Sequence, residues 1–227
     1  MFPMERILHG VMRFRMEVVP RRLGLYRELA NGQRPQALFI ACADSRVAPE
    51  LITQADPGEL FTCRNAGNIV PPYGQATGGV SAAIEYAVMA LGVRDIVVCG
   101  HSDCGAMKGI LHPEALAGMP TVRTWLNHAE VARRVVEANG PTVDKLQALV
   151  EENVLAQLDH LRTHPSVAAH LAAGDMTLHG WVYSLATSEV RAFDAEQHRF
   201  VPLGSTAVPA VSARRRPIAA RRGDVRG

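Results

Sequence analysis

Two apolar runs of the sequence, ALFIA and DIVVCG, are each followed by side chains that can bind a metal or carry charge. In chain order these side chains are Cys42, Asp44, Arg46, His101 and Cys104. Zinc prefers thiolate and imidazole ligands, and a catalytic zinc uses three protein ligands so that a fourth position stays open. The pattern Cys-x58-His-x2-Cys therefore offers a candidate zinc site. On spacing alone, ordinary buried thiols and a hydrogen-bonded core histidine explain these residues equally well.

Asp44 and Arg46 suit the surroundings of such a metal. A free carboxylate beside the ion could itself become the fourth ligand, whereas an arginine can hold it in a two-point contact. The carboxylate then accepts a hydrogen bond from a bound water or hydroxide and orients it. Cys104 precedes an expected helix start, where the helix dipole favours a thiolate. Gly105 lets its backbone N–H approach a small anion closely.

The composition fits one globular domain with a sizeable core, because 227 residues are 48% hydrophobic and 20% charged. The formal net charge of +2 gives no indication of nucleic-acid binding. No apolar run approaches the ~18 residues of a membrane helix, and charged residues interrupt the N-terminal segment where a signal peptide would be apolar. We therefore expect a cytoplasmic protein without membrane or nucleic-acid partners, whose four cysteines are thiols rather than a disulfide framework.

The elements that must position these residues indicate an α/β fold. Apolar runs over 37–43 and 95–101 do not alternate, which is typical of strands buried on both faces of a parallel sheet, and 59–65 is a third expected strand. The intervening GVSAAIEYAVMALGV has apolar residues at helical spacing and ends near Gly92. A strand, a helix and a strand form a βαβ unit, so we expect a central, mostly parallel β-sheet flanked by helices.

Further helices are expected over 121–138 and 142–163, the second ending before Pro165. The segments MTLHGWVYSL and VRAFDAEQHRF are expected to form a C-terminal strand pair. The last fourteen residues contain six Arg and one Asp, a charge block typical of solvated, disordered chain ends. The expected organisation is an N-terminal helical arm (1–35), a domain that carries the candidate zinc site (36–205) and a basic tail (206–227).

Four motifs, CADSR, GELFTCRNAGN, GGVSAAIEYA and GHSDCGA, resemble those of the β-class carbonic anhydrases in order and spacing. EENVLAQLDHLRTHPSV and LHGWVY are also similar to that family, and the resemblance covers roughly residues 30–203. It implies a zinc lyase that interconverts CO₂ and bicarbonate, with release of a proton, by attack of zinc-bound hydroxide on CO₂. It also implies one zinc ion per chain, held by Cys42, His101 and Cys104.

The same resemblance implies roles for residues outside the ligand set. The family's catalytic Asp–Arg dyad falls on Asp44 and Arg46. A Gln-x-Pro segment, a PGE-x-F segment and an I-E-Y segment supply the family's substrate pocket, and Gly105 can add a backbone N–H. The expected substrate-binding residues are thus Gln33, Phe61, Tyr86 and Gly105. The resemblance implies that each pocket forms between two subunits, so we expect a homodimer or a higher, even-numbered homo-oligomer.

Some bacterial members of that family close their zinc site with the Asp and bind bicarbonate at a regulatory site. They typically carry Trp and Gly where this chain has Phe39 and Ala41, so we expect the open form, with Asp44 paired to Arg46. One alternative is a relative that uses the same ligands on carbonyl sulfide or carbon disulfide, although the pocket residues favour CO₂. Another is a non-catalytic bicarbonate sensor or assembly component, which the complete set of ligands and dyad disfavours.

Other cysteine, histidine and polar side chains are expected to have structural roles. Cys63 and Cys99 are expected to pack in the interior, since free cysteine is among the most buried residue types. Asp103 is expected to face solvent or to cap a helix N-terminus. His179 and Trp181 alternate along an expected strand and are predicted to be structural.

Overall fold

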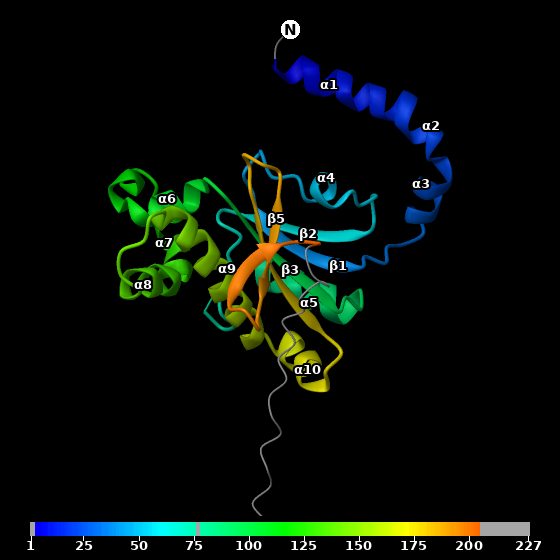
Figure 1. The fold of residues 1–227 in the computed structure, drawn as a ribbon. Helices are drawn as coiled ribbons and strands as arrows, with labels where there is room; N and C mark the ends of the chain where they lie inside the picture. Colours follow the sequence, from blue (N-terminus) through cyan, green and yellow to red (C-terminus); the bar gives the residue numbers. More distant parts are fainter. Residues whose placement is uncertain (1–2, 76–77, 205–227) are drawn as a thin grey trace, which may run out of the picture.

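The structure is a computed structural model that describes residues 3–75 and 78–204, and Figure 1 shows the arrangement of its elements. A six-stranded sheet in the order β2-β1-β3-β4-β5-β6 forms its centre. The strands are, in chain order, β1 (Ala37–Cys42), β2 (Leu60–Asn65), β3 (Asp95–His101), β4 (Thr177–Tyr183), β5 (Val190–Asp194) and β6 (Arg199–Pro202). β1 to β4 pair in parallel, and β5 and β6 are antiparallel, so the expected mostly parallel sheet is confirmed.

Helices flank this sheet, and a helical arm precedes it. The arm comprises α1 (Pro3–Arg13), a π-helical segment (Phe14–Val18), α2 (Val19–Arg21) and α3 (Leu23–Leu29). The next helices are α4 (Pro49–Thr53), α5 (Gly79–Glu85), a second π-helical segment (Tyr86–Ala90), α6 (Gly105–Leu111) and a 3₁₀ turn (Pro113–Leu116). The last are α7 (Pro120–Leu126), a 3₁₀ turn (Asn127–Ala129), α8 (Glu130–Ala138), α9 (Lys145–Thr163) and α10 (Pro165–Ala173). Among the described helices, none has the length and apolarity needed to cross a membrane.

Buried apolar side chains lie on both faces of the central strands. Ile40 and Val98 belong to the larger core, which contains buried side chains of α5, α6 and α9. Phe39 and Val97 belong to a smaller core on the other face, where the ring centroids of Phe39 and Trp181 are 5.8 Å apart. Burial on both faces explains why the runs that form β1 and β3 lack polar alternation.

α9 packs closely against β3 and β4 because two glycines face it. A Cβ atom at Gly100 would lie 2.9 Å from Val154 Cγ2, and one at Gly180 would lie 3.0 Å from Leu158 Cδ1. Any larger side chain would therefore separate the helix from the sheet. This close approach places α9 within hydrogen-bonding reach of the loop that follows β2.

The segment predicted to supply the second strand of the C-terminal pair contains two strands. VRAFDAEQHRF is not one strand, because β5 ends at Asp194 and β6 begins at Arg199. The Asp194 carboxylate accepts hydrogen bonds from the backbone N–H groups of Glu196 and Gln197, at 2.9 and 3.0 Å. Aspartate favours such turns, and the chain then reverses through His198, whose φ is 49°. The expected C-terminal strand pair is confirmed, but the expectation that this segment forms a single strand is wrong.

The predicted helices are mostly confirmed, with two differences. A 3₁₀ turn divides the helix expected over 121–138, and α10 is an additional helix. α10 has proline at its first position, Pro165, and ends at Gly174 with a φ of 78°, which is the usual pairing of start and stop signals. The N-terminal arm is helical as predicted and stands away from the body in Figure 1. The tail expected over 206–227 lies outside the described residues.

Gly100→Ala tests the close packing of α9. The added methyl group would meet Val154 and Val150 at 2.9 and 3.1 Å, and overpacking of this kind costs about 1–3 kcal/mol. We expect the free energy of unfolding, measured by urea denaturation, to fall by that amount. Gly118→Ala is the control, because a Cβ there meets no described atom within 4 Å. Equal stability of the two variants would contradict this account of the packing.

Candidate metal centre

Three buried side chains meet at the carboxyl ends of β1 and β3. Cys42 is the last residue of β1, His101 is the last residue of β3, and Cys104 comes immediately before α6. Their ligand atoms all lie within 4.8 Å of one another. Parallel strands end at one edge of a sheet, which is where α/β proteins collect their ligands. The structure thus brings the three predicted ligands together, with Gly105 next to them at the start of α6.

His101 presents one ring nitrogen for metal binding. Its Nδ1 lies 2.9 Å from the carbonyl oxygen of Ser102, which can only accept, so Nδ1 carries the proton. In the neutral ring, Nε2 then has a free lone pair, and this buried atom has no hydrogen-bond partner among the described residues. Zinc-binding histidines are oriented in this way by a hydrogen bond from their other nitrogen. Two sulfurs and one imidazole form a donor set that fits zinc.

The thiols of the two candidate ligands, Cys42 and Cys104, lie close enough to interact with each other. The hydrogen bond between them is the largest cause that lowers the pKa of Cys42, and it raises the pKa of Cys104. The backbone N–H of Gly67 also donates to Cys42 Sγ, with an N–S distance of 3.4 Å. A bound cation favours ionised thiols, so a metal ion at this position would allow both sulfurs to be thiolates.

Asp44 and Arg46 form the predicted ion pair. Nε of Arg46 donates to Oδ1 of Asp44 at 2.9 Å, Nη2 donates to Oδ2 at 2.8 Å, and the Arg46 backbone N–H donates to Oδ1 at 3.0 Å. The hydrogen bonds from the guanidinium are the main reason that the pKa of Asp44 lies well below its usual range. Oδ2 is also 3.9 Å from Nε2 of His101. The carboxylate therefore faces the candidate metal centre while Arg46 holds it.

Asp103 has a role in this site that the sequence pattern does not indicate. Nη1 of Arg46 donates to Oδ2 of Asp103 at 2.9 Å, and Lys108 forms a second ion pair with the same carboxylate. Asp103 faces solvent as expected, with its side chain 49% exposed, and it pairs with Arg46 as well; only the alternative that it caps a helix is wrong. The N-cap of α6 is Cys104, and Asp103 has a φ of 59°, a left-handed conformation that aspartate adopts more readily than most residues.

Arg64 is a second residue without a predicted role. Its Nε donates to the carbonyl oxygen of Cys42 at 3.1 Å, and its Nη2 donates to that of Asp44 at 2.7 Å. Arg64 thereby fixes the backbone between a metal ligand and the carboxylate. The parallel register places Arg64 opposite Ala41, so this contact depends on a strand pairing that the sequence pattern does not specify.

Three of the predicted substrate-binding residues lie far from the metal centre of their own chain. Phe61 is paired with Leu38, four residues before Cys42 on β1, which separates it from the ligands by about 13 Å along the strands. The ring centroids of Phe61 and Tyr86 are 5.9 Å apart. Gln33 precedes the start of β1. These side chains therefore lie toward the amino ends of β1 and β2, whereas Cys42 lies at the carboxyl end of β1.

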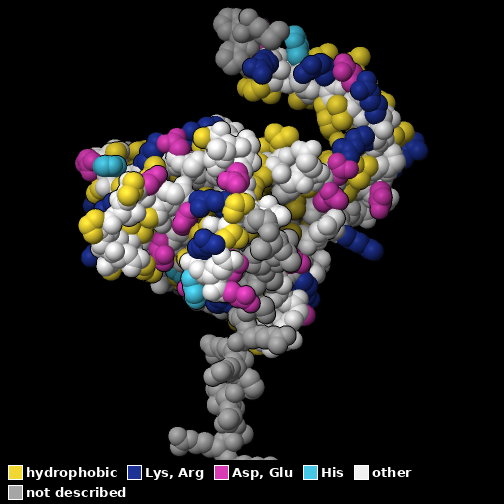
Figure 2. Space-filling model, in the orientation of Figure 1, with side chains coloured by type: hydrophobic (Ala, Val, Ile, Leu, Met, Phe, Trp, Pro, Cys, Tyr) yellow, Lys and Arg dark blue, Asp and Glu magenta, His cyan; other side chains and the backbone are white. Residues whose placement is uncertain are grey.

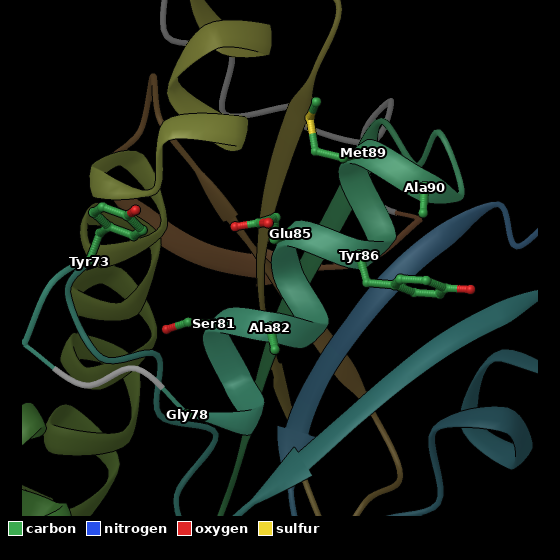
Figure 3. Close-up of a pocket in the computed structure, with 8 residues that line it drawn as sticks. All are labelled: Tyr73, Gly78, Ser81, Ala82, Glu85, Tyr86, Met89 and Ala90. Atoms are coloured by element: carbon green, nitrogen blue, oxygen red, sulfur yellow. The ribbon is translucent and has the colours of Figure 1, made fainter.

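A hollow of about 630 Å³ lies on the outer side of α5 and the π-helical segment that follows it, and not at the metal centre. Figure 3 shows its lining, which consists of Tyr73, Gly78, Ser81, Ala82, Glu85, Tyr86, Met89 and Ala90. Tyr86 and Met89 are 51% and 66% exposed. Within one described chain, the hollow contains only Tyr86 of the predicted site residues. It is an exposed, partly apolar face and not the place where the candidate ligands meet.

The remaining cysteine and histidine predictions are confirmed. Cys99 is fully buried, and burial raises its pKa to about 12, while half-buried Cys63 packs against the larger core. Nε2 of His179 lies 2.9 Å from Oδ1 of Asp95, and Trp181 belongs to the smaller core. All four side chains thus pack in the interior or bind a neighbouring side chain, as predicted.

Comparison with known proteins identifies the family of this fold and site. The family described as carbonic anhydrase matches residues 37–190. A carbonic anhydrase of Pseudomonas aeruginosa is 54% identical over 202 residues, which cover 88% of this chain and 92% of that protein. The solved structure of the β-carbonic anhydrase CcaA has a TM-score of 0.86 at 45% identity and covers 91% of this chain and 94% of its own.

A more distant structure belongs to a report of two tetrameric β-carbonic anhydrases of the ascomycete Sordaria macrospora. It has a TM-score of 0.72 at 28% identity and covers 90% of this chain and 98% of its own. The family match spans the Cys–His–Cys group and the Asp44–Arg46 pair. The chain therefore belongs to the β-class carbonic anhydrase family, whose enzymes reversibly hydrate CO₂ to bicarbonate and a proton.

Proposed function

We propose that the chain hydrates CO₂ with one zinc ion held by Cys42, His101 and Cys104. The observation that carries this proposal is the meeting of two buried sulfurs with Nε2 of His101, all within 4.8 Å. A zinc ion with three protein ligands supplies Lewis-acid chemistry, because it makes water acidic enough to act as a nucleophile near neutral pH. The chain's own residues must then orient the water and bind CO₂ or bicarbonate.

Asp44 is proposed to orient the reacting water. Its lowered pKa keeps it a carboxylate at neutral pH, so it accepts a hydrogen bond and does not take up the proton. Arg46 occupies both carboxylate oxygens, and this two-point contact competes with any tendency of the carboxylate to bind the metal. Phe39 and Ala41 support the same open arrangement. The N–H of Gly105, beside Cys104, is proposed to donate to an oxygen of CO₂ or bicarbonate.

We further propose a homodimer, or a higher even-numbered assembly, in which two subunits build each substrate pocket. Gln33, Phe61 and Tyr86 are too far from the ligands of their own chain to line its pocket. A second copy related by a two-fold axis could bring its own Phe61 and Tyr86 to the metal centre of the first, and vice versa. The tetrameric relatives from Sordaria macrospora support an even-numbered assembly.

The N-terminal arm supports a partner of this kind. Figure 2 shows hydrophobic side chains along the arm, interspersed with arginines. Its exposed large apolar residues are Met4, Ile7, Leu8, Val11, Met12, Phe14, Met16, Val18 and Leu23. An apolar surface of this length needs a covering partner. We propose that the arm of one subunit lies against the exposed face of α5 in the other.

The organisation into an arm (1–35), a zinc domain (36–205) and a basic tail (206–227) is also proposed. It is supported by the separation between α3 and β1. A cytoplasmic location is proposed because all four cysteines are free thiols. The ligand cysteines must be reduced to bind a metal, and a reducing compartment keeps them so.

Stopped-flow CO₂ hydration with a pH indicator, run together with metal analysis, tests the catalytic proposal. We expect about one zinc per chain in both the wild type and Asp44→Ala. The variant should lose roughly 10²-fold or more in kcat/KM, because the reacting water is no longer oriented. Zinc without CO₂ hydration in the wild type at about pH 8.5 would contradict the proposal. Carbonyl sulfide would then be the next substrate to test.

Arg46→Lys tests how the carboxylate is held. One ammonium cannot reproduce the two-point contact, so we expect the pKa of Asp44 to rise toward its ordinary value. Carbon NMR of labelled aspartate in the metal-free protein would measure the change. Arg94→Lys is the matched control, since Arg94 pairs with Asp175 elsewhere. An unchanged pKa of Asp44 in Arg46→Lys would show that Arg46 does not set its charge.

Subunit mixing tests the shared pocket. We expect Cys42→Ser and Tyr86→Ala each to be weakly active alone. A mixed dimer contains one site with intact ligands and an intact partner tyrosine, so coexpression of the two variants should restore about a quarter of wild-type activity. If Tyr86 served the metal centre of its own chain, the mixed dimers would contain no intact site, because neither variant chain has both Cys42 and Tyr86. Failure of mixing to restore activity would therefore contradict the shared pocket.

A further inference from the structure

One face of α9 carries polar side chains that are buried against the loop after β2. Asn153, Gln157 and His160 recur at helical spacing, which places them on the same side of α9, and His164, the C-cap residue at which the helix ends, continues this row. Asn153 and Gln157 are 1% and 0% exposed. Buried amides require hydrogen-bond partners. In this protein, many of those partners are backbone groups of the loop 66–73.

The two amides fix the first half of this loop. Nδ2 of Asn153 donates to the carbonyl oxygen of Gly67 at 3.0 Å, and Oε1 of Gln157 accepts from the N–H of Val70 at 2.8 Å. Nε2 of Gln157 also donates to Oδ1 of Asn153 at 2.9 Å, so each amide orients the other. Because Oδ1 of Asn153 accepts from Gln157, the amide orientation of Asn153 is defined, and its Nδ2 is directed at the loop.

The two histidines hold the second half of the loop. Nδ1 of His160 lies 2.8 Å from the carbonyl oxygen of Val70, and Nε2 of His164 lies 3.0 Å from that of Pro71. A carbonyl oxygen can only accept, so both ring nitrogens donate. Burial is the largest cause that lowers the pKa of each histidine, which keeps these donors neutral. These contacts lie farther along the loop from the metal centre than those of Asn153.

Gly67 connects the loop to the metal centre. Its N–H donates to Cys42 Sγ at 3.4 Å, while its carbonyl oxygen accepts from Asn153. Its φ is 84°, and a Cβ there would lie 3.0 Å from Cβ of Ala106 and 3.3 Å from Cε of Met107. Glycine alone combines this conformation with this packing. The Gly67 N–H shares its peptide group with the carbonyl oxygen of Ala66, which accepts from Nε1 of Trp125 at 2.8 Å. Asn153 holds the next peptide group, so the two contacts together fix the direction of the Gly67 N–H.

We propose that Asn153 is a positioning residue for the metal centre, because it holds the peptide group that follows Gly67 and, together with the contact of Trp125 to Ala66, keeps the Gly67 N–H directed at the sulfur of Cys42. A hydrogen bond to a thiolate ligand orients it and withdraws part of its charge. The partners of metal ligands typically change metal affinity 10–100-fold when they are altered. This inference rests on the proposed binding of zinc by Cys42.

Asn153→Leu tests this role, because leucine has a similar volume and cannot donate to Gly67. The first measurement is the rate at which the zinc enzyme loses its metal to an excess of chelator. We expect loss about 10-fold faster, or more, than in the wild type. The second is the thiolate-to-metal absorption band of the cobalt-substituted protein, which we expect to shift because the sulfur loses a hydrogen bond.

His164→Leu is the matched control, since it removes a buried donor from the same face of α9 but acts on Pro71. We expect it to lower the free energy of unfolding while leaving zinc loss and the cobalt band unchanged. If Asn153→Leu does not fold, Asn153→Ser provides the test. Its hydroxyl is shorter than the amide, and the same two changes are expected.

The outcomes separate the two proposals. If the tested variant of Asn153 loses stability but keeps the wild-type rate of zinc loss and the wild-type cobalt band, the positioning role is overturned and Asn153 is purely structural. If the wild-type protein shows no thiolate-to-cobalt band, the proposed zinc ligands are wrong. A faster loss of zinc with a shifted band, in Asn153 variants and not in His164→Leu, supports the positioning role.

Discussion

The parallel pairing of β1 with β3 is the constraint on which the candidate site depends. The register that places Ala41 opposite Cys99 brings the last residues of both strands, Cys42 and His101, to one edge of the sheet. No local sequence contact could join two ligands so far apart in the chain. Cys104 is only three residues after His101, in the turn between β3 and α6. The conformation of this short turn is therefore enough to bring the third candidate ligand beside the other two.

Around this edge, each polar group holds another in place. Arg46 holds Asp44 toward the metal centre, and Arg64 fixes the backbone that joins Asp44 to Cys42. Two glycines let α9 approach the sheet, and a face of α9 holds the loop that donates to the sulfur of Cys42. These contacts hold the side chains at this edge in fixed positions relative to one another.

The strands and the candidate metal ligands at their ends could be predicted from the sequence, because each is indicated by residues that are adjacent in the chain. An unbroken apolar run followed by Cys42 or His101 indicates a buried strand with a ligand at its end. Contacts set by register or by the placement of a helix face are not local, so the roles of Arg64 and Asn153 emerge only from the fold. Asp103 has a left-handed backbone conformation that no spacing rule indicates.

The strand expected to continue through Asp194 ends there, because the Asp194 side chain accepts a hydrogen bond from the following backbone and the chain reverses. The pocket residues are indicated only by the family resemblance, and the sheet register, which separates Phe61 from Cys42 in one chain, supports the proposal that two subunits build each pocket.

The most direct test of the central claim is a crystal structure of the protein as purified, with anomalous diffraction measured on both sides of the zinc absorption edge. The account predicts one zinc peak per chain, in contact with Cys42, His101 and Cys104, while Asp44 remains paired with Arg46. A zinc peak elsewhere, or Asp44 turned away from Arg46 to take the fourth position on the metal, would contradict it.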